Sequence, residues 1–255
     1  MDDRNTTVAT AAGPAIGGER ADPRPRPPVE EVGDVALADL FAEPGCPLCR
    51  LRERSARRFV GSFLWESVTD VDFRERLARG RGFCPEHGGL VLAIDTAAEG
   101  TPVGSAILLE SILRLRLADL EDRGRRAPRP RRGRRAGDPG AVDCPVCEQV
   151  DVAVAGASAR ILDLLRLPAW RATLAAAEPC IPDLESLDRL ASARRTAAWA
   201  EVAAAQRARL VAVADRLTGL VEHSAHDRRH LRTRSEVAAV GEAAALLGFR
   251  ASTDG

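Results

Sequence analysis

The chain has 255 residues, of which 45% are hydrophobic, so it is long enough to bury a core as one large domain or two small ones. Its 37 basic residues, all arginines, are balanced by 37 acidic residues, and the net charge of zero excludes a global electrostatic attraction to nucleic acid or membranes. No segment has the length and apolarity of a membrane span or a secretory signal, so we expect a cytoplasmic protein with no membrane partner. Its six cysteines would then stay reduced and act as metal ligands, whereas a secreted chain could pair them in disulfides.

Composition divides the chain into four segments. Residues 1–33 are rich in proline, glycine and charge and are predicted to be disordered. Two helical halves are predicted at 34–122 and 141–250, because apolar residues recur there at helical spacing and no segment alternates with period two. Between them, residues 123–140 form a linker of arginine, proline and glycine that can bury almost nothing. The predicted fold is an all-α helical bundle.

One long helix is predicted near the C-terminus, at 196–230. Its apolar seam would pack against other helices or against a second copy of the chain, which makes a homo-oligomer an open expectation. The seam consists of Leu210, Val213, Leu217 and Leu220.

The two predicted halves resemble each other. Three pairs of motifs recur in the same order, at offsets of 98, 97 and 96 residues, and this register indicates an internal duplication. The pairs are Cys46-Pro-Leu-Cys49 with Cys144-Pro-Val-Cys147, Phe73-Arg-Glu-Arg-Leu77 with Trp170-Arg-Ala-Thr-Leu174, and Cys84-Pro-Glu-His87 with Cys180-Ile-Pro-Asp183.

The cysteine motifs of the first half predict a zinc site. Proline is favoured at the first position of a helix, so the cysteine before it should cap the helix and point the same way as the residue three further on. The helix dipole at this end favours the thiolate form that binds metal. Two such helix starts would supply the ligands Cys46, Cys49, Cys84 and His87, a Cys3His set typical of zinc. A thioredoxin-like dithiol at Cys46 and Cys49 is disfavoured because no βαβ pattern accompanies it.

The second half departs from this pattern at one position. Its predicted set is Cys144, Cys147, Cys180 and Asp183, and a carboxylate can also bind zinc. We therefore expect one zinc ion in the first half and a second where Asp183 acts as a ligand; alternatively, the second half is a copy that has lost its metal. If it is a worn copy of the first, Asp183→His should tighten zinc binding. No persuasive general base lies nearby, and no catalytic residue is predicted.

Other residues suggest weaker hypotheses. Eight arginines between Arg123 and Arg135 could bind nucleic acid, but no aromatic residues are interleaved to stack bases, which favours a solvated spacer. His223, His226 and His230 would share one face of the long helix, as a metal-binding or pH-sensing group or simply as an exposed polar helix end. The tryptophans are expected to anchor the core; they are Trp65, Trp170 and Trp199.

These motifs resemble an uncharacterised bacterial family of helical proteins in which CPxC and FCxxH motifs occur twice in one chain. The resemblance covers roughly residues 40–250 and is carried by the Cys-Pro motifs together with the segment LVEHSAHDRRHLRTR. It implies a helical zinc-binding protein with paired sites and supplies no activity. Asp183 stands where the family pattern has histidine.

The sequence therefore favours a zinc-binding interaction or regulatory module with structural metal sites, acting on an unidentified protein partner rather than as an enzyme. Two alternatives stay open. One is a nucleic-acid-associated regulator that uses the arginines at 123–135, and the other is a thiol-based redox sensor that releases zinc when its cysteines are oxidised.

Overall fold

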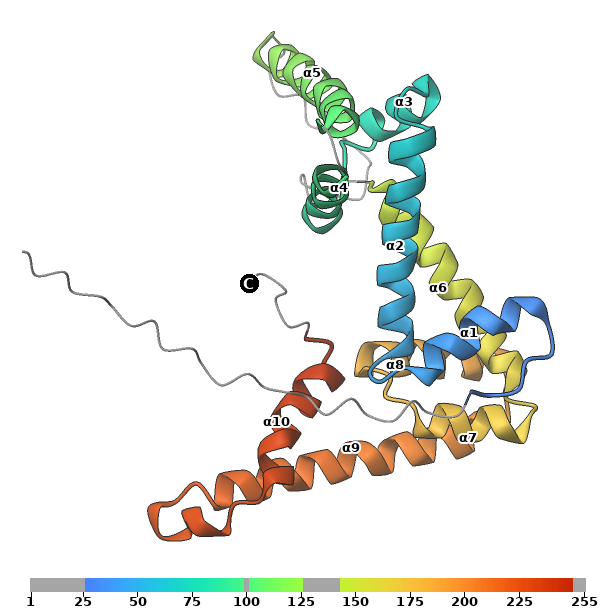
Figure 1. The fold of residues 1–255 in the computed structure, drawn as a ribbon, viewed down its shortest axis with the longest axis vertical. Helices are drawn as coiled ribbons and strands as arrows, with labels where there is room; N and C mark the ends of the chain where they lie inside the picture. Colours follow the sequence, from blue (N-terminus) through green and yellow to red (C-terminus); the bar gives the residue numbers. More distant parts are fainter. Residues whose placement is uncertain (1–25, 99–100, 126–142, 250–255) are drawn as a thin grey trace, which may run out of the picture.

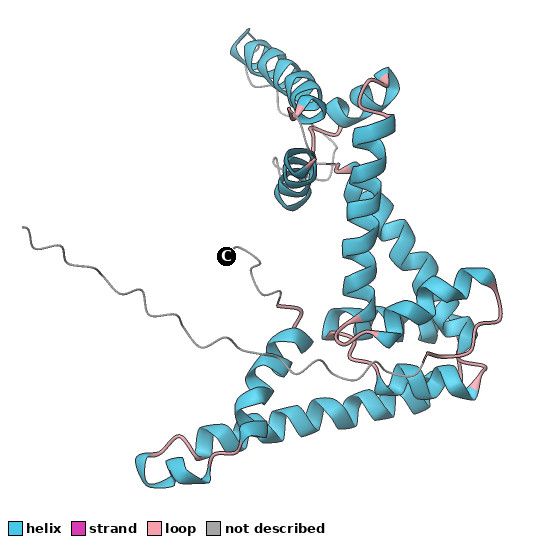
Figure 2. Ribbon diagram, in the orientation of Figure 1, coloured by secondary structure: helices cyan, strands magenta, loops and turns pink. Residues whose placement is uncertain are grey.

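The computed structural model describes residues 26–98, 101–125 and 143–249. Within these ranges every regular element is helical, with ten α-helices, one 3₁₀-helix and no strand (Figures 1 and 2). The predicted all-α fold is confirmed. Among the described residues no helix combines the length and the apolarity needed to cross a membrane.

Most helices are separated by a few residues along the chain, but between α5 and α6 residues 126–142 lie outside the described part. The helices are α1 (Val32–Ala42), α2 (Pro47–Glu66), α3 (Val71–Arg79), α4 (Pro85–Ala97), α5 (Val103–Arg125), α6 (Pro145–Leu164), α7 (Pro168–Ala176), α8 (Ile181–Arg194), α9 (Trp199–Glu222), the 3₁₀-helix η1 (His226–Leu231) and α10 (Arg234–Leu246). Residues 1–25 of the predicted disordered segment lie outside the described residues. Most of the predicted linker does too, although α5 continues to Arg125.

The framework of the molecule is the pairing of its two 20-residue helices. α2 and α6 lie side by side and run in opposite directions (Figure 1). At 1.5 Å per residue each is about 30 Å long. At one end of the pair are α3, α4 and α5; at the other end are α1, α7, α8 and α9 (Figure 1). α10 packs back against α9.

Two apolar clusters cover the two ends of this pair. One gathers α1, α7, α8 and α9 around Trp170 and Ile161, and also takes in Leu48 from the start of α2. The other surrounds Phe63 of α2 and includes Val146 from the start of α6. Each cluster therefore takes side chains from both predicted halves, so a boundary at the linker does not separate two cores.

The C-terminal region differs from the sequence-based prediction. The helix expected at 196–230 ends at Glu222, and a second helix, α10, begins at Arg234. Thr233 caps α10, because its hydroxyl accepts a hydrogen bond from the Glu236 amide while the Glu236 carboxylate accepts one from the Thr233 amide. The Leu210, Val213 and Leu217 part of the predicted seam packs against α10 of the same chain.

Two of the three tryptophans are core anchors. Trp170 is fully buried and Trp199 is nearly so, as expected. The prediction was wrong for Trp65, which is 90% exposed near the end of α2. Trp65 lies two residues after the buried Phe63, and a step of two places a side chain on a different side of a helix.

A buried glutamine of α9 completes the end of α7. The side-chain amide nitrogen of Gln206 lies 2.8, 3.0 and 3.1 Å from the carbonyl oxygens of Leu174, Ala175 and Ala177. Carbonyls at a helix C-terminus have no partner within the helix, so this amide satisfies groups that would otherwise be buried without one.

We predict that Gln206→Ala lowers the free energy of unfolding by about 1–3 kcal/mol, because buried carbonyls lose their donor. Gln149→Ala is the matched control: Gln149 is exposed on α6, and its loss should change stability by no more than about 0.5 kcal/mol. Urea unfolding of both variants followed by circular dichroism tests the difference. Equal effects would show that the contacts of Gln206 contribute nothing.

Candidate metal centres

Four cysteines occupy the N-cap positions of four helices, three of them as Cys-Pro motifs predict and the fourth, Cys180, in a Cys-Ile-Pro sequence. Each of these helices has proline in its first turn, which fixes the backbone direction at the helix start. The side chain three residues further on lies beside the capping cysteine. The resulting pairs are Cys46 with Cys49 on α2, Cys84 with His87 on α4, Cys144 with Cys147 on α6, and Cys180 with Asp183 on α8.

These pairs combine into two groups of four whose candidate ligand atoms all lie within 4.8 Å of one another. The first, which we name the histidine site, joins the starts of α4 and α6. The second, the aspartate site, joins the starts of α2 and α8. The histidine site consists of Cys84, His87, Cys144 and Cys147, and the aspartate site of Cys46, Cys49, Cys180 and Asp183.

The predicted pairing of the motifs was wrong, although each predicted residue belongs to one of the two groups. The sequence-based prediction joined Cys46 to Cys84 and Cys144 to Cys180, within each half. α2 carries the chain about 30 Å away from Cys46, and the nine-residue α3 is too short to bring it back. Because α6 runs antiparallel to α2, Cys144 arrives beside Cys84 instead, and each site joins one half to the other.

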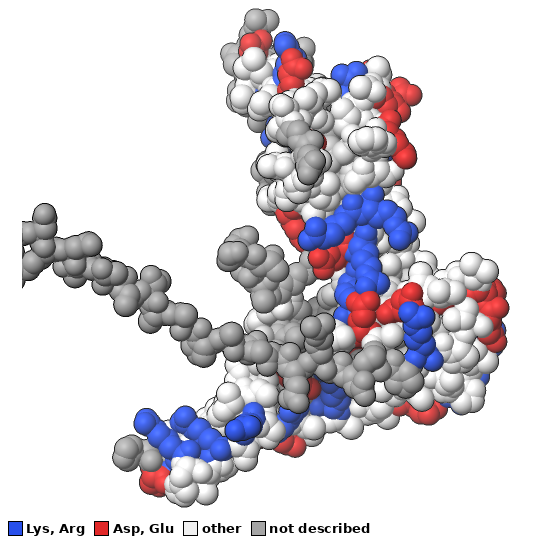
Figure 3. Space-filling view, in the orientation of Figure 1, with Lys and Arg blue, Asp and Glu red and all other residues white. Residues whose placement is uncertain are grey.

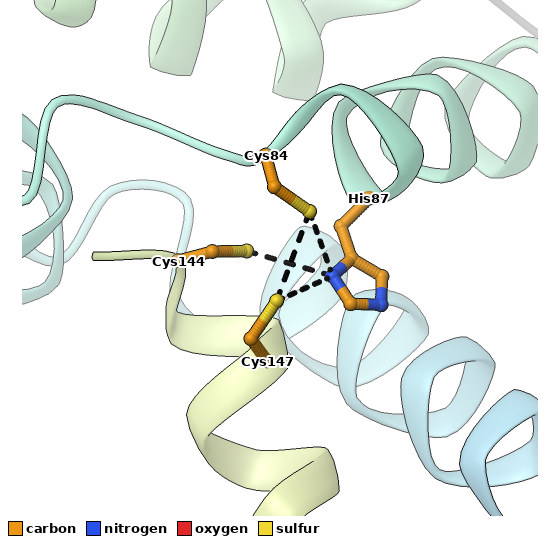
Figure 4. Close-up of side chains that lie close together, drawn as sticks. All are labelled: Cys84, His87, Cys144 and Cys147. Atoms are coloured by element: carbon orange, nitrogen blue, oxygen red, sulfur yellow. Dashed lines mark hydrogen bonds between the residues drawn. The ribbon is translucent and has the colours of Figure 1, made fainter. Parts of the chain in front are cut away.

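The histidine site is compact and partly enclosed. The Nδ1 atom of His87 points at the three sulfurs and lies 3.2 Å from the Sγ atoms of Cys84 and Cys147 and 3.6 Å from that of Cys144 (Figure 4). The Cys84 and Cys147 sulfurs are 3.7 Å apart. His87 and Cys144 are buried, and Cys84 and Cys147 are partly buried.

The aspartate site has the same form with an oxygen in place of the nitrogen. The Oδ2 atom of Asp183 lies 3.1, 3.2 and 3.7 Å from the Sγ atoms of Cys46, Cys180 and Cys49. The Cys180 sulfur is 3.9 Å from that of Cys46 and 3.7 Å from that of Cys49. Arg52 forms two hydrogen bonds to the same carboxylate, one to each oxygen.

Backbone contacts hold the helix starts together at both sites. At the histidine site the Asp143 amide donates to the Gly80 carbonyl at 2.9 Å. A β-carbon at Gly80 would lie 2.5 Å from the Asp143 carbonyl oxygen, so only glycine permits this approach. At the aspartate site Gly45, with φ +87°, donates its amide to the Glu178 carboxylate at 2.9 Å. One residue of each link, Asp143 or Gly45, directly precedes a capping cysteine.

The close sulfurs shift one another's pKa. Hydrogen bonds from Cys180 and Cys46 lower the pKa of Cys49 to about 3, while hydrogen bonds with Cys46 and Cys49 raise the pKa of Cys180. Burial, followed by the contacts with Cys84 and Cys144, raises the pKa of Cys147 to about 12. Without a cation, therefore, each cluster retains protons at neutral pH. A metal ion must displace them, so its affinity should rise with pH.

The sulfur–sulfur distances fit a tetrahedral zinc ion. With zinc–sulfur bonds of about 2.3 Å, tetrahedral geometry places two sulfurs about 3.8 Å apart. Three of the sulfur separations between capping pairs, those of Cys46–Cys180, Cys49–Cys180 and Cys84–Cys147, are 3.7–3.9 Å. Three thiolates with one imidazole or one carboxylate are also ligands that zinc accepts. Both groups can hold a metal ion and are compatible with zinc. All six cysteines carry free thiols.

The other predicted groups do not form sites among the described residues. His223 caps the end of α9, whereas His226 and His230 belong to η1, so the helix face that they were predicted to share does not exist. The His223 ring nitrogen lies 3.1 Å from the Glu236 carboxylate. Most of the Arg123–Arg135 cluster lies outside the described residues.

Sequence reasoning missed Arg52 as a member of the aspartate site. Its spacing carries a signal, because Arg52 lies six residues after Cys46, within the first two turns of the same helix. That signal becomes informative only once Asp183 is known to pair with Cys46 rather than with Cys144.

We predict that brief oxidation in the presence of a chelator forms the disulfides Cys84–Cys147 and Cys49–Cys180, because these sulfurs are 3.7 Å apart. Proteolysis and mass spectrometry of the linked peptides identify them. Disulfides joining Cys46 or Cys49 to Cys84 would instead support the pairing within each half. A sample treated with zinc in place of chelator is the control, since bound thiolates react more slowly.

Gly80→Ala is expected to weaken metal retention at the histidine site, because the added methyl group must push the Asp143 backbone away from the start of α6. Gly89→Ala on α4 is the matched control: nothing lies within 4 Å of its β-carbon, and it should stabilise the helix by about 0.5–1 kcal/mol. Metal content after dialysis against a weak chelator measures the effect. Full retention by Gly80→Ala would contradict the proposed role of this contact.

Comparison with known proteins gives one partial relative. An "Uncharacterized 23.9 kDa protein in xynA 3'region" of Caldicellulosiruptor sp. is 35% identical to this chain over 78 residues. The match spans 31% of this chain and 36% of the relative, so about two thirds of each protein lies outside it. No family model and no solved structure matches the chain. The expected resemblance to uncharacterised bacterial proteins is therefore supported, without evidence on the duplicated motifs.

Proposed function

We propose that the protein binds two zinc ions as structural clamps and serves as an interaction or regulatory module rather than as an enzyme. The observation that carries this proposal is the pair of four-ligand groups, in which three inter-pair sulfur separations of 3.7–3.9 Å match the edges of a zinc tetrahedron. The role as a module, the identity of the metal and the cytoplasmic location are parts of the proposal.

A structural role is favoured because each site is closed. Catalytic zinc sites keep one position for water or substrate, whereas structural sites fill all four positions with protein ligands. Both groups here supply four ligands from the chain. Zinc at these positions would have no free coordination site at which to activate water.

The location of the sites suggests what the clamps would stabilise. The histidine site joins α4 to α6 and the aspartate site joins α2 to α8, so each ion would close a long loop of the chain. Metal bound only by the folded chain adds its binding free energy to folding. Two ions at opposite ends of α2 and α6 would fix both the orientation and the register of this pair.

The helix lengths support the inferred internal duplication. α2, α3 and α4 have 20, 9 and 13 residues, and α6, α7 and α8 have 20, 9 and 14. The first and third helix of each series begin at a capping cysteine. In a duplicated chain of this kind, the ligand pair on the third helix of each copy would complete the site at the start of the long helix of the other copy.

An exposed row of leucines on α5 supports a role in binding another protein. The helix buries Leu108 and presents five further leucines to solvent, four of which form a row at spacings of four, four and three residues. Rows of exposed apolar side chains are uncommon on monomeric proteins. The leucines of this row are Leu109, Leu113, Leu117 and Leu120.

A redox sensor remains the second candidate function, favoured by the sulfur separations. A peroxide could oxidise two thiolates of one site to a disulfide and itself be reduced to water, with release of the zinc ion. Cys46 and Cys49 are only partly buried, so a small reagent can reach these sulfurs. Zinc release by peroxide that thiol reductant reverses would support this candidate.

The nucleic-acid alternative receives no support from the described residues. Figure 3 shows basic side chains along α2, but Arg54 and Arg57 of this helix form ion pairs with Glu43 and Glu53. The cluster at 123–135 and a homo-oligomer through residues 196–230 stay predictions.

Native mass spectrometry should find two zinc ions per chain. A strong chelator should remove both and lower the melting temperature. Zinc at a thousandfold excess over its Kd stabilises by about 4 kcal/mol per site. For a chain of this size that corresponds to a melting temperature about 8–16 °C lower for each ion removed.

Two single variants show which ion is lost. His87→Ala should release the ion of the histidine site and Asp183→Ala that of the aspartate site, each leaving one zinc. A chain purified without metal, which neither binds added zinc nor gains stability from it, would refute the proposal.

A further inference from the structure

Asp183 does not act alone at the aspartate site. Its carboxylate side chain is 1% exposed and is held by the guanidinium of Arg52, with Nη1 2.8 Å from Oδ2 and Nη2 2.5 Å from Oδ1. The same Oδ2 faces the three sulfurs. Arg52 therefore donates to both oxygens, and Oδ2 is the one that also faces the three sulfurs and is placed to bind a metal ion.

The two sites would carry different charges without this arginine. A zinc ion with three thiolates and a neutral imidazole has one net negative charge, whereas a carboxylate in place of the imidazole makes it two. Excess charge in a partly buried site is unfavourable unless it is paired. Arg52 supplies one positive charge in direct contact with the carboxylate, which makes the two sites equal.

The two sites differ both in their fourth ligand and in the residue six positions after the N-cap of the long helix. Arg52 lies six residues after the N-cap of α2, and Val150 lies six residues after the N-cap of α6. Val150 is buried in the apolar cluster beside the histidine site. Thus the histidine ligand occurs with an apolar neighbour, and the aspartate ligand occurs with a cation.

We infer that Arg52 is a positioning residue of the aspartate site, which fixes Asp183 as a one-oxygen metal ligand and balances its charge, so that the two residues together replace one histidine. This inference rests on the proposed metal binding. It assigns to Arg52 a role that differs from general stabilisation of the fold.

The inference reverses the outcome that the sequence predicts for Asp183→His. The substitution removes the carboxylate that Arg52 contacts through both of its terminal nitrogens, and leaves the guanidinium beside an imidazole and a metal ion. Zinc binding at this site should therefore weaken. Adding Arg52→Val to Asp183→His reproduces the histidine–valine combination of the other site and should restore zinc binding.

The test uses the full-length zinc-loaded protein and measures competition with a chromophoric chelator. Asp183→Ala first identifies which release step belongs to the aspartate site. Arg52→Met should then lower zinc affinity at that site by about 10–100-fold, the usual effect of losing a partner of a metal ligand, and leave the other site unchanged. Arg52→Lys keeps the charge but not the paired contact, so its zinc affinity at the aspartate site should lie between those of the wild-type protein and Arg52→Met.

Arg160→Met is the matched control. Arg160 also holds a buried carboxylate through two nitrogens, at 2.7 and 2.9 Å from Asp34, and both pairs combine a carboxylate that is 1% exposed with an arginine that is 28–29% exposed. This pair contacts neither metal group. Arg160→Met should lower the melting temperature and leave both zinc affinities unchanged.

A spectroscopic measurement separates positioning from folding. With Co²⁺ in place of zinc, Arg52→Met should shift the visible absorption of the aspartate site, because Asp183 can then bind through both oxygens. Arg160→Met should not shift it.

Each outcome decides the inference. Equal zinc affinities and Co²⁺ spectra for Arg52→Met and the wild-type protein would overturn it, as would tighter zinc binding by Asp183→His alone. If Arg52→Met does not fold, the zinc affinity of Asp183→His is compared with that of Asp183→His/Arg52→Val instead. A double variant that binds zinc no more tightly than Asp183→His would contradict the inference. Absence of zinc from the wild-type protein would instead refute the proposed function itself.

Discussion

The antiparallel contact of α2 with α6 determines where every candidate ligand lies. Each helix begins at a capping cysteine, and their opposite directions place these two cysteines at opposite ends of a pair about 30 Å long. The short helices that follow α2 and α6 then begin near the far ends of the long ones. A second pair of ligands therefore meets the start of the other long helix, and both groups of four join segments distant in sequence.

This arrangement explains which features could be predicted from sequence. The helix starts follow from local rules, since proline at the first position and a capping side chain before it define them within a few residues. The i+3 spacing also brings Cys46 beside Cys49 and Cys84 beside His87 without tertiary information. The pairing of the motifs depends on the direction and length of α2, and nothing in the motifs themselves distinguishes exchange between halves from closure within each half.

Two other differences have local causes. Thr233 and Glu236 form a capping box that marks the start of a new helix. The end of the preceding helix at Glu222 was not predicted, because apolar residues continue at helical spacing after it. Trp65 was placed in the core by residue type alone, yet the buried side of α2 is already occupied by Phe63, which stacks on Phe83 at a centroid separation of 5.7 Å. Residue type predicts burial less reliably than position on the helix does.

The difference between the two sites is best understood as a difference in charge compensation. A histidine brings no charge and permits an apolar neighbour, and Val150 accordingly joins the core beside the histidine site. An aspartate brings a charge that a partly buried position cannot leave unpaired, and Arg52 reaches it from the second turn of α2. Asp183 is then not the remnant of a lost histidine ligand. It is one half of a pair whose other half lies on the partner helix, so the ligand and its cation can be exchanged for a histidine only together.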